Sequence, residues 1–175
     1  HAFQGAWAMA ELADAVVAEG AGFGVLLDRN AERLALVNER GESICDEDVL
    51  ALICAALLKS RAGGTVVVPV TAPGAIEKVA MDLHGRVVRS QANPRSMMEK
   101  AIEARVMMGE AGVPQFQPML DGLFALAVLL EQLAQGSAPL SSMVSAMPRS
   151  FMTRRLVDCP WQSKGRVMRH LIEET

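Results

Sequence analysis

The chain has 175 residues, of which 51% are apolar and 21% are charged, and 17 Lys and Arg against 20 Asp and Glu give a net charge of −3. This composition excludes a chain that is disordered throughout, and the small negative charge gives no reason to expect a nucleic acid or an anionic membrane as a partner. The longest apolar run, Val49 to Leu58, is too short to span a bilayer. We therefore expect a globular protein without nucleic-acid or membrane partners.

The three cysteines, Cys45, Cys54 and Cys159, are odd in number and far apart, and no CxxC pair or nearby histidine accompanies them. This pattern argues against a zinc site and against a disulfide framework. It is typical of small buried side chains in a reducing compartment, so we expect a cytoplasmic protein. The chain begins with His1 rather than Met, which we interpret as a boundary that leaves any upstream targeting segment out of view.

The first forty residues predict one helix and two strands. An Ala-rich stretch from Ala6 to Ala18 favours a helix that stops at the glycines that follow it. The short apolar run Phe23 to Leu27 is typical of a strand buried on both faces. Arg33 to Asn38 predicts the next strand, and Glu39 to Gly41 a turn.

Helices and strands alternate through the rest of the chain. Asp46 and Asn93 stand where helix caps are expected, and Pro73 and Pro94 suit a first helical turn. The expected helices are Asp46 to Leu58, Pro73 to Leu83, Asn93 to Arg105, Met119 to Ala134, Leu140 to Met147 and the basic Ser163 to Glu174. The expected strands are Thr65 to Val70, Arg86 to Ser90, Val106 to Met108 and Phe151 to Cys159, and Gly109 to Pro118 is expected to be a loop.

This alternation predicts the α/β class, with helices layered on a largely parallel sheet. We expect one complete layered α/β/α domain over residues 41–150, with a mainly parallel (mixed) four-stranded sheet. Residues 1–40 and 151–175 hold too few elements to form sheets of their own, so they are expected to be partial flanking elements.

One loop carries the spacing of a metal site. Asp28, Asn30 and Glu32 place oxygen-bearing side chains at i, i+2 and i+4 directly after an expected strand, where they could bind one hard cation such as Mg²⁺. An EF-hand is excluded because Arg33 occupies the position that needs Gly, and because strands rather than helices flank the loop. A plain polar turn remains the alternative, and spacing alone favours it.

The strand, this loop, the stretch LALVNERGE and the helix after it together resemble the α-D-phosphohexomutases (phosphoglucomutase/phosphomannomutase). The metal loop of that family is Asp-Gly-Asp-x-Asp-Arg, so the resemblance implies that Asp28, Asn30 and Glu32 stand for the three carboxylates and Arg33 for the arginine. Asn30 carries no charge and Arg29 replaces the glycine. The resemblance therefore implies a degenerate site whose Mg²⁺ binding is weak or absent.

A longer stretch, GGTVVVPVTAPGAIEKVAMDLHGRVVRS, resembles the third domain of this family. The sugar-binding loop there is Gly-Glu-x-Ser-Gly-His, and Gly109 and Glu110 match its first two residues while the hydroxyl and imidazole are missing. Asp121-Gly122 matches a family Asp-Gly at the head of the long helix. Arg95 lies at the start of the third-domain helix, where it is either a phosphate ligand or an ordinary surface arginine.

The resemblance thus implies a hexose phosphate as ligand, with Arg33, Arg95, Gly109 and Glu110 as substrate-binding residues. It implies that residues 1–40 end the family's second domain with the metal loop, that 41–150 are the sugar-binding third domain, and that 151–175 begin the fourth. The remaining mutase-like domains would be its partners. Cys159 to Arg169 is similar to the start of the fourth domain in a branch fused to a nucleotidyltransferase of the mannose-1-phosphate guanylyltransferase type. Lys164, Arg166 and Arg169 form a basic helix face there, either solvated or in contact with a phosphate.

Family members move a phosphoryl group between the 1- and 6-hydroxyls of a hexose, using a phosphoserine and Mg²⁺. The phosphoserine loop would lie before His1, so we expect this chain alone to carry no catalytic residue and to be inactive. Two hypotheses remain for the whole protein. It is a phosphohexomutase-like protein of sugar-phosphate metabolism, or a non-catalytic mutase-like module fused to a nucleotidyltransferase. The degraded metal and sugar loops favour the second hypothesis for the module itself.

Overall fold

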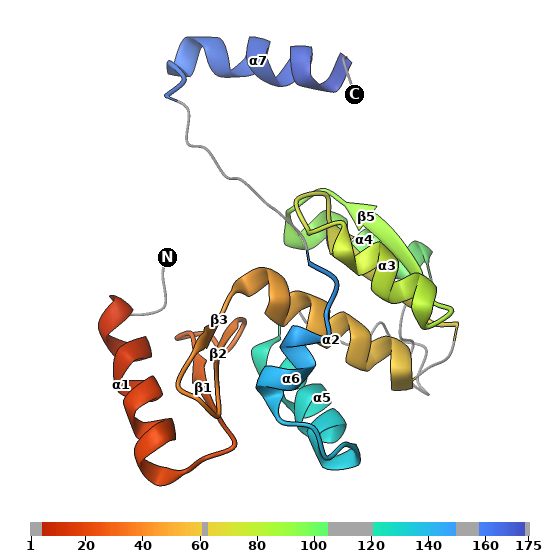
Figure 1. Ribbon diagram of the computed structural model, residues 1–175. Helices are drawn as coiled ribbons and strands as arrows, with labels where there is room; N and C mark the ends of the chain where they lie inside the picture. Colours follow the sequence, from red (N-terminus) through yellow and green to blue (C-terminus); the bar gives the residue numbers. More distant parts are fainter. Residues whose placement is uncertain (1–4, 61–62, 105–120, 150–157, 174–175) are drawn as a thin grey trace.

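The computed structural model describes residues 5–60, 63–104, 121–149 and 158–173 (Figure 1). Its helices are α1 (Gly5–Glu19), α2 (Asp46–Ser60), α3 (Ala75–Asp82), α4 (Pro94–Glu103), α5 (Gly122–Gln135), α6 (Leu140–Ser145) and α7 (Trp161–Glu173). Its strands are β1 (Phe23–Leu27), β2 (Leu34–Asn38), β3 (Ser43–Ile44), β4 (Thr65–Pro69) and β5 (Arg86–Ser90). Except for the two-residue strand β3, which the sequence did not predict, these elements match the expected ones to within a few residues at most ends.

The first sheet is an antiparallel meander in the order β1-β2-β3. Short connections join its neighbours, and strands joined that closely can pair only in the antiparallel sense. Helix α1 covers one face so closely that a Cβ on Gly24 would lie 2.6 Å from a methyl carbon of Val16. Strand β1, at one edge of the meander, is half-buried along most of its length. The prediction that both of its faces are buried was wrong, whereas β2 is buried throughout.

The second sheet is the parallel pair β4–β5, in which Thr65 is opposite Arg86 and Pro69 is opposite Ser90. Successive residues of a strand face opposite sides of the sheet. Val66 and Val68 accordingly belong to the main core with α2 and α3, whereas Val67 packs with Ala101 of α4 on the other face. The pair is therefore a β layer between two helical layers.

Helix α2 lies at the centre of the molecule and is buried along most of its length. It contacts α3, α5 and α6 and also reaches β2 and β4, so it joins the two sheets into one hydrophobic core (Figure 1). Burying a leucine, isoleucine or valine side chain, as α2 does several times, stabilises a fold by about 1.5–3 kcal/mol relative to exposing that side chain. The run of apolar residues that defines α2 in the sequence is therefore the main link between the meander and the parallel pair.

The α/β class and the layered arrangement are confirmed, and the sheets differ in detail from the expected four strands. The described part of the chain holds two strands in parallel and a separate antiparallel meander. The expected strand Val106 to Met108 and nearly all of Phe151 to Cys159 lie outside the described residues. In the part that is described, no helix is long and apolar enough to cross a membrane.

Candidate functional site

A pocket of about 490 Å³ lies where the meander meets the carboxyl ends of the parallel strands. Its lining comes from the loop before β2, the first turns of α2, the segment after β4 and the start of α4. These residues are Glu32, Arg33, Leu34, Asp46, Glu47, Val49, Leu50, Ile53, Pro69, Thr71, Ala72, Pro73, Ala92, Pro94 and Met97. Crevices at the carboxyl ends of strands are where open α/β sheets bind ligands.

One side of the pocket is residues 28–33, which we call the Asp28 loop. The Oδ1 atom of Asp28 accepts hydrogen bonds from the backbone N–H groups of Glu32 (2.8 Å) and Arg33 (3.1 Å). The backbone N–H of Asp28 in turn donates to the carbonyl of Arg33 at 3.1 Å. Ala31 sits within this turn at a positive φ of 54°. The carboxylate of Asp28 thus fixes the shape of the loop that carries Glu32 and Arg33 to the pocket.

The start of α5 holds the Asp28 loop from behind. The N–H of Gly122 donates to the carbonyl of Ala31 at 2.7 Å. A Cβ at position 122 would lie 3.0 Å from that oxygen and 3.1 Å from the carbonyl oxygen of Arg33, so only glycine fits this approach without movement. Asp121 caps the helix, accepting from the N–H of Phe124 at 2.9 Å. The Asp-Gly pair noted in the sequence therefore supports the loop.

Arg33 reaches from the loop to the first turn of α2, where its Nη2 lies 3.3 Å from Oδ2 of Asp46. Both side chains are more than half exposed, at 57% and 55%. Exposed ion pairs contribute about 0–1 kcal/mol to stability. The guanidinium is therefore held only lightly at the rim of the pocket, and an anionic ligand could compete with Asp46 for it.

The Asp28 loop is a poor fit to a divalent cation. Asp28 and Glu32 supply two carboxylates and Asn30 only an amide, and Oδ1 of Asp28 already accepts two backbone hydrogen bonds. Within residues 5–60, 63–104, 121–149 and 158–173, no three or more His, Cys, Asp or Glu side chains gather as a metal site would require. Weak Mg²⁺ binding stays a prediction, and we derive no catalytic step through a metal.

The opposite side of the pocket is residues 70–73, which we call the β4 wall. Arg89, the next-to-last residue of β5, donates from Nε and Nη2 to the two carboxylate oxygens of Glu77, at 2.7 and 2.9 Å. Its Nη1 donates to the carbonyls of Pro69, Val70 and Ala72. The hydrogen bond from Arg89 lowers the pKa of Glu77 below its ordinary value.

No pattern in the sequence marks Arg89 as a site residue. Its partners lie 12 to 20 positions away in the chain, so no local spacing connects them. The available signal was an arginine near the carboxyl end of an otherwise apolar strand, and that observation alone does not indicate a role.

The other expected site residues are placed as follows. Asn93 caps α4, accepting from the N–H of Ser96 at 2.8 Å, as predicted. Arg95 is the second residue of that helix, with its side chain 88% exposed and its Nε 2.8 Å from Glu99. Pro94 and Met97 line the pocket, whereas Arg95 is not among the lining residues. Gly109 and Glu110 lie outside the described residues.

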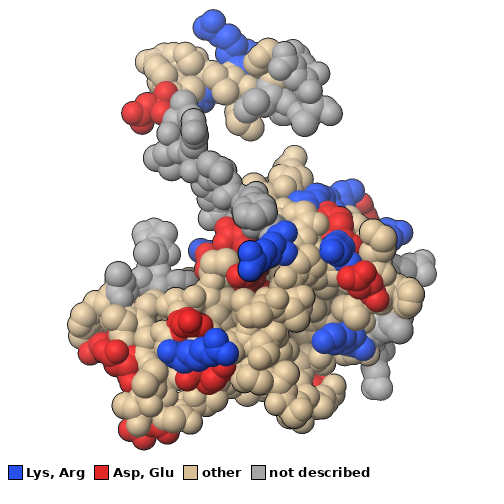
Figure 2. All heavy atoms as spheres, viewed as in Figure 1, with Lys and Arg blue, Asp and Glu red and all other residues tan. Residues whose placement is uncertain are grey.

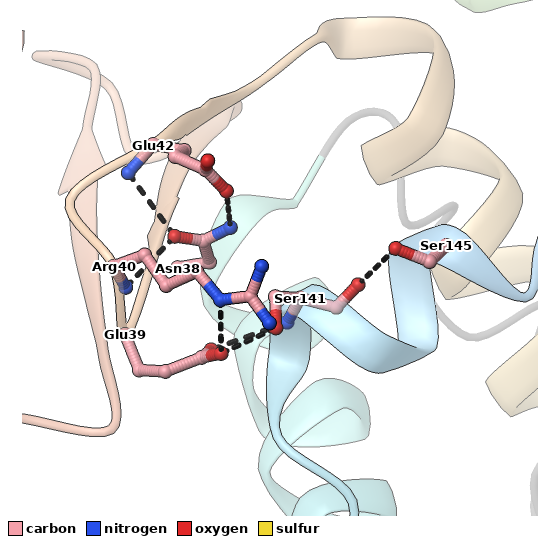
Figure 3. A network of polar contacts seen from close by, with 6 residues as sticks. All are labelled: Asn38, Glu39, Arg40, Glu42, Ser141 and Ser145. Carbon is pink, nitrogen blue, oxygen red and sulfur yellow. Dashed lines mark hydrogen bonds and ion pairs between the residues drawn. The ribbon is translucent and has the colours of Figure 1, made fainter.

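A polar network joins the meander to α6 (Figure 3). Glu39, in the turn after β2, accepts hydrogen bonds from the hydroxyl and from the N–H of Ser141, a residue 102 positions away in the first turn of α6. These hydrogen bonds lower the pKa of Glu39, and the bond from the Ser141 hydroxyl has the largest effect. Asn38 shapes the turn by accepting from the N–H groups of Arg40 (2.9 Å) and Glu42 (3.1 Å). The network lies away from the pocket lining and is structural.

Charges of both signs are interspersed over the face shown in Figure 2, in keeping with the small net charge. In α7, the Nζ of Lys164 lies 5.2 Å from the ring centre of Trp161, and Trp161 is 79% exposed. Of the cysteines, only Cys54 is fully buried, and burial raises the pKa of its thiol to about 12. Cys45 is exposed and Cys159 half-buried, so the expectation of burial holds for one of the three.

Comparisons with known proteins match the chain to mutases. Residues 46–151 match the family model described as phosphoglucomutase/phosphomannomutase, alpha/beta/alpha domain III. A probable phosphoglucosamine mutase of Pyrococcus horikoshii is 28% identical over 158 residues, which cover 87% of this chain and 35% of that protein. A phosphopentomutase of Thermococcus kodakarensis is 30% identical over 158 residues, covering 89% of this chain and 35% of that protein. The chain thus spans about a third of the length of these relatives.

Two solved structures share the fold. A phosphoglucomutase/phosphomannomutase family protein of Burkholderia thailandensis superposes with a TM-score of 0.70 at 20% identity, covering 85% of this chain and 33% of that one. A putative phosphomannomutase of Thermus thermophilus gives a TM-score of 0.65 at 19% identity, covering 76% and 32%.

Proposed function

Since the chain belongs to the phosphoglucomutase/phosphomannomutase family, through alpha/beta/alpha domain III at residues 46–151, we propose that it is the sugar-holding part of a phosphohexomutase-like protein of sugar-phosphate metabolism. The proposed reaction of the whole protein is the interconversion of hexose 1- and 6-phosphates. We propose that the remaining mutase-like domains supply the phosphoserine and the distal phosphate site. A cytoplasmic location is part of the same proposal, in keeping with the three free cysteines.

The observation that carries this proposal is the pocket between the Asp28 loop and the β4 wall. It joins the domain that matches the family model to a loop that precedes it in the chain, at the carboxyl ends of β4 and β5. Its volume of about 490 Å³ lies in the range of small-molecule sites. Ten of its fifteen lining residues are apolar, and the polar ones are Glu32, Arg33, Asp46, Glu47 and Thr71. A mostly apolar lining with a small number of polar groups is usual for a site that must orient one ligand.

In this proposal the chain's own residues bind and orient the sugar. The guanidinium of Arg33 exchanges its exposed partner Asp46 for a phosphate. A planar guanidinium is well suited to this, because it can form two parallel hydrogen bonds with phosphate oxygens. Thr71 supplies a hydroxyl from the other side. Gly109 and Glu110 match the family's sugar-binding loop, so we propose that Glu110 accepts from sugar hydroxyls, and Arg95 adds positive charge near the start of α4. Such positioning and charge stabilisation account for most of the catalysis of phosphoryl transfer.

If an Mg²⁺ ion binds to this chain, Asp28, Asn30 and Glu32 are the residues that would hold it. We propose that this binding is weak, for the reasons of charge and geometry given above. The relatives reported are named as mutases, so the comparisons do not favour the alternative of a module fused to a nucleotidyltransferase.

Calorimetric titration of the chain with glucose 6-phosphate tests the proposal. We expect saturable but weak binding, in the millimolar range, because few charged contacts must offset the entropy of association. Arg33→Gln should weaken it at least about threefold, as the loss of one charged hydrogen bond requires. Arg86→Gln, at the exposed amino end of β5 away from the pocket, is the matched control and should bind as the wild type does. Equal binding by all three proteins, or none by the wild type, would contradict the proposal.

A further inference from the structure

Arg89 uses all of its side-chain nitrogen atoms, two on the carboxylate of Glu77 and one on three backbone carbonyls. Nε and Nη2 form two parallel bonds with the carboxylate of Glu77, at 2.7 and 2.9 Å. Nη1 donates to the carbonyls of Ala72 (2.9 Å), Val70 (3.1 Å) and Pro69 (3.4 Å). The side chain of Arg89 is 31% exposed and that of Glu77 44%, so the pair is more shielded than the pair of Arg33 with Asp46.

The three carbonyls belong to the chain as it leaves β4. This segment continues as the β4 wall, and Thr71, Ala72 and Pro73 line the pocket directly. Three backbone hydrogen bonds tie the wall to its surroundings. The N–H of Val70 donates to the carbonyl of Ser90 (2.8 Å), that of Ala72 to Pro69 (2.9 Å), and that of Ile76 to Pro73 (3.2 Å). In the part of the chain that the structure describes, no other group donates a hydrogen bond to the carbonyls of Val70 and Ala72, so Arg89 alone holds them together on one side.

We infer that Arg89, oriented by Glu77, is a positioning residue that fixes the β4 wall and with it the hydroxyl of Thr71 at the pocket. Arg89 itself is not among the residues that line the pocket, so it acts through the wall rather than on the ligand. Its effect on binding rests on the proposed function, because it assumes that the hexose phosphate occupies this pocket. The effect of Arg89 on the β4 wall does not depend on the proposed function.

The chemistry of guanidinium makes a sharp test possible. A planar guanidinium can bond a carboxylate with one edge and carbonyls with the remaining nitrogen, whereas a lysine ammonium offers a single point of charge. Arg89→Lys therefore keeps the positive charge beside Glu77 and loses the simultaneous hold on the carbonyls. Glu77→Gln keeps the carbonyl bonds and weakens the orientation of the guanidinium. Arg86→Lys, on the same strand but at its exposed amino end, is the matched control.

The experiment measures, for each protein, the affinity for glucose 6-phosphate and the amide hydrogen exchange of Val70, Ala72 and the central strand residue Val67. We expect Arg89→Lys to weaken binding at least about threefold and to speed exchange at Val70 and Ala72 about tenfold, with Val67 unchanged. Glu77→Gln should show the same pattern to a smaller extent. Arg86→Lys should match the wild type in both readouts.

A general loss of stability would instead speed exchange at Val67 as well, and that result would overturn a specific role in positioning. Unchanged exchange at Val70 and Ala72 in Arg89→Lys would also overturn it, even if the affinity fell. Should Arg89→Lys not fold, Glu77→Gln decides by the same criteria. If the wild type does not bind glucose 6-phosphate, the proposed function fails, and the inference about the wall is then decided by amide exchange alone.

Discussion

The two sides of the pocket are held in opposite ways. The Asp28 loop is organised by its own first residue, since the carboxylate of Asp28 bonds N–H groups only four and five positions ahead. The β4 wall is organised by Arg89, from 17 to 20 positions away on another strand. A segment held by bonds between nearby residues shows a recognisable spacing of residue types in the sequence. A segment held by a side chain far along the chain shows no such spacing. The first side could therefore be recognised before the structure and the second could not.

We expect the largest effect on the Asp28 loop from a substitution at Gly122. Gly122→Ala places a Cβ about 3.0–3.1 Å from two backbone carbonyl oxygens, and neither can move without distorting the Asp28 loop. We expect the free energy of unfolding to fall by about 1–3 kcal/mol, the usual cost of overpacking a tight contact. Denaturant unfolding measures it.

Gly74 provides the matched control, because it precedes α3 and a Cβ there would meet nothing within 4 Å. Gly74→Ala should change the free energy of unfolding by no more than about 0.5 kcal/mol. Equal effects of the two substitutions would show that the approach of α5 to the Asp28 loop is not as close as described.

The hydrogen bonds between Glu39 and Ser141 are a second long-range contact, and this contact lies outside the pocket. Glu39→Gln removes the charge that accepts two hydrogen bonds while keeping the shape of the side chain, and should cost about 1 kcal/mol at pH 7. The pKa of Glu39 is lowered in the folded protein. Its contribution is therefore present above the pKa of the unfolded chain and is lost as the pH falls through the folded value.

The difference in unfolding free energy between wild type and Glu39→Gln should accordingly shrink when the pH is lowered from 7 to 3. A difference that stays constant over this range would mean that the charge of Glu39 is not what stabilises the contact. Ser141→Ala should reproduce part of the loss at pH 7, since it removes the hydroxyl donor and leaves the backbone N–H in place.

The pair of Arg33 with Asp46 should have the smallest effect on stability. Both side chains are more than half exposed, so Asp46→Asn should lower the free energy of unfolding by no more than about 1 kcal/mol. It should, however, leave Arg33 more available to a phosphate and raise the affinity for glucose 6-phosphate. Weaker binding by Asp46→Asn would argue that Asp46 orients Arg33 for the ligand instead of competing with it.

Much of the fold could be predicted because its determinants are local. The cap at Asn93, the apolar run of α2 and the β-branched run of β4 each specify their element within one window of sequence. The half-burial of β1 could not be predicted in the same way, since it depends on which strands pair beside it. For the candidate site, spacing and resemblance pointed to the loop that holds Asp28 and Arg33, whose roles as metal and substrate ligands stay predictions. Arg89 and Glu77, in contrast, become neighbours only when β5 and α3 pack together.

The most direct test of the central claim is the map of amide chemical-shift changes in the chain during titration with glucose 6-phosphate. We expect the shifts to gather on both sides of the pocket, at Glu32 to Leu34 and at Thr71 and Ala72, and at the start of α4. The amides of Gly109 and Glu110 should shift as well. Shifts confined to the basic helix α7, or changes on the Asp28 loop without any on the β4 wall, would contradict the claim that the two sides form one hexose-phosphate site.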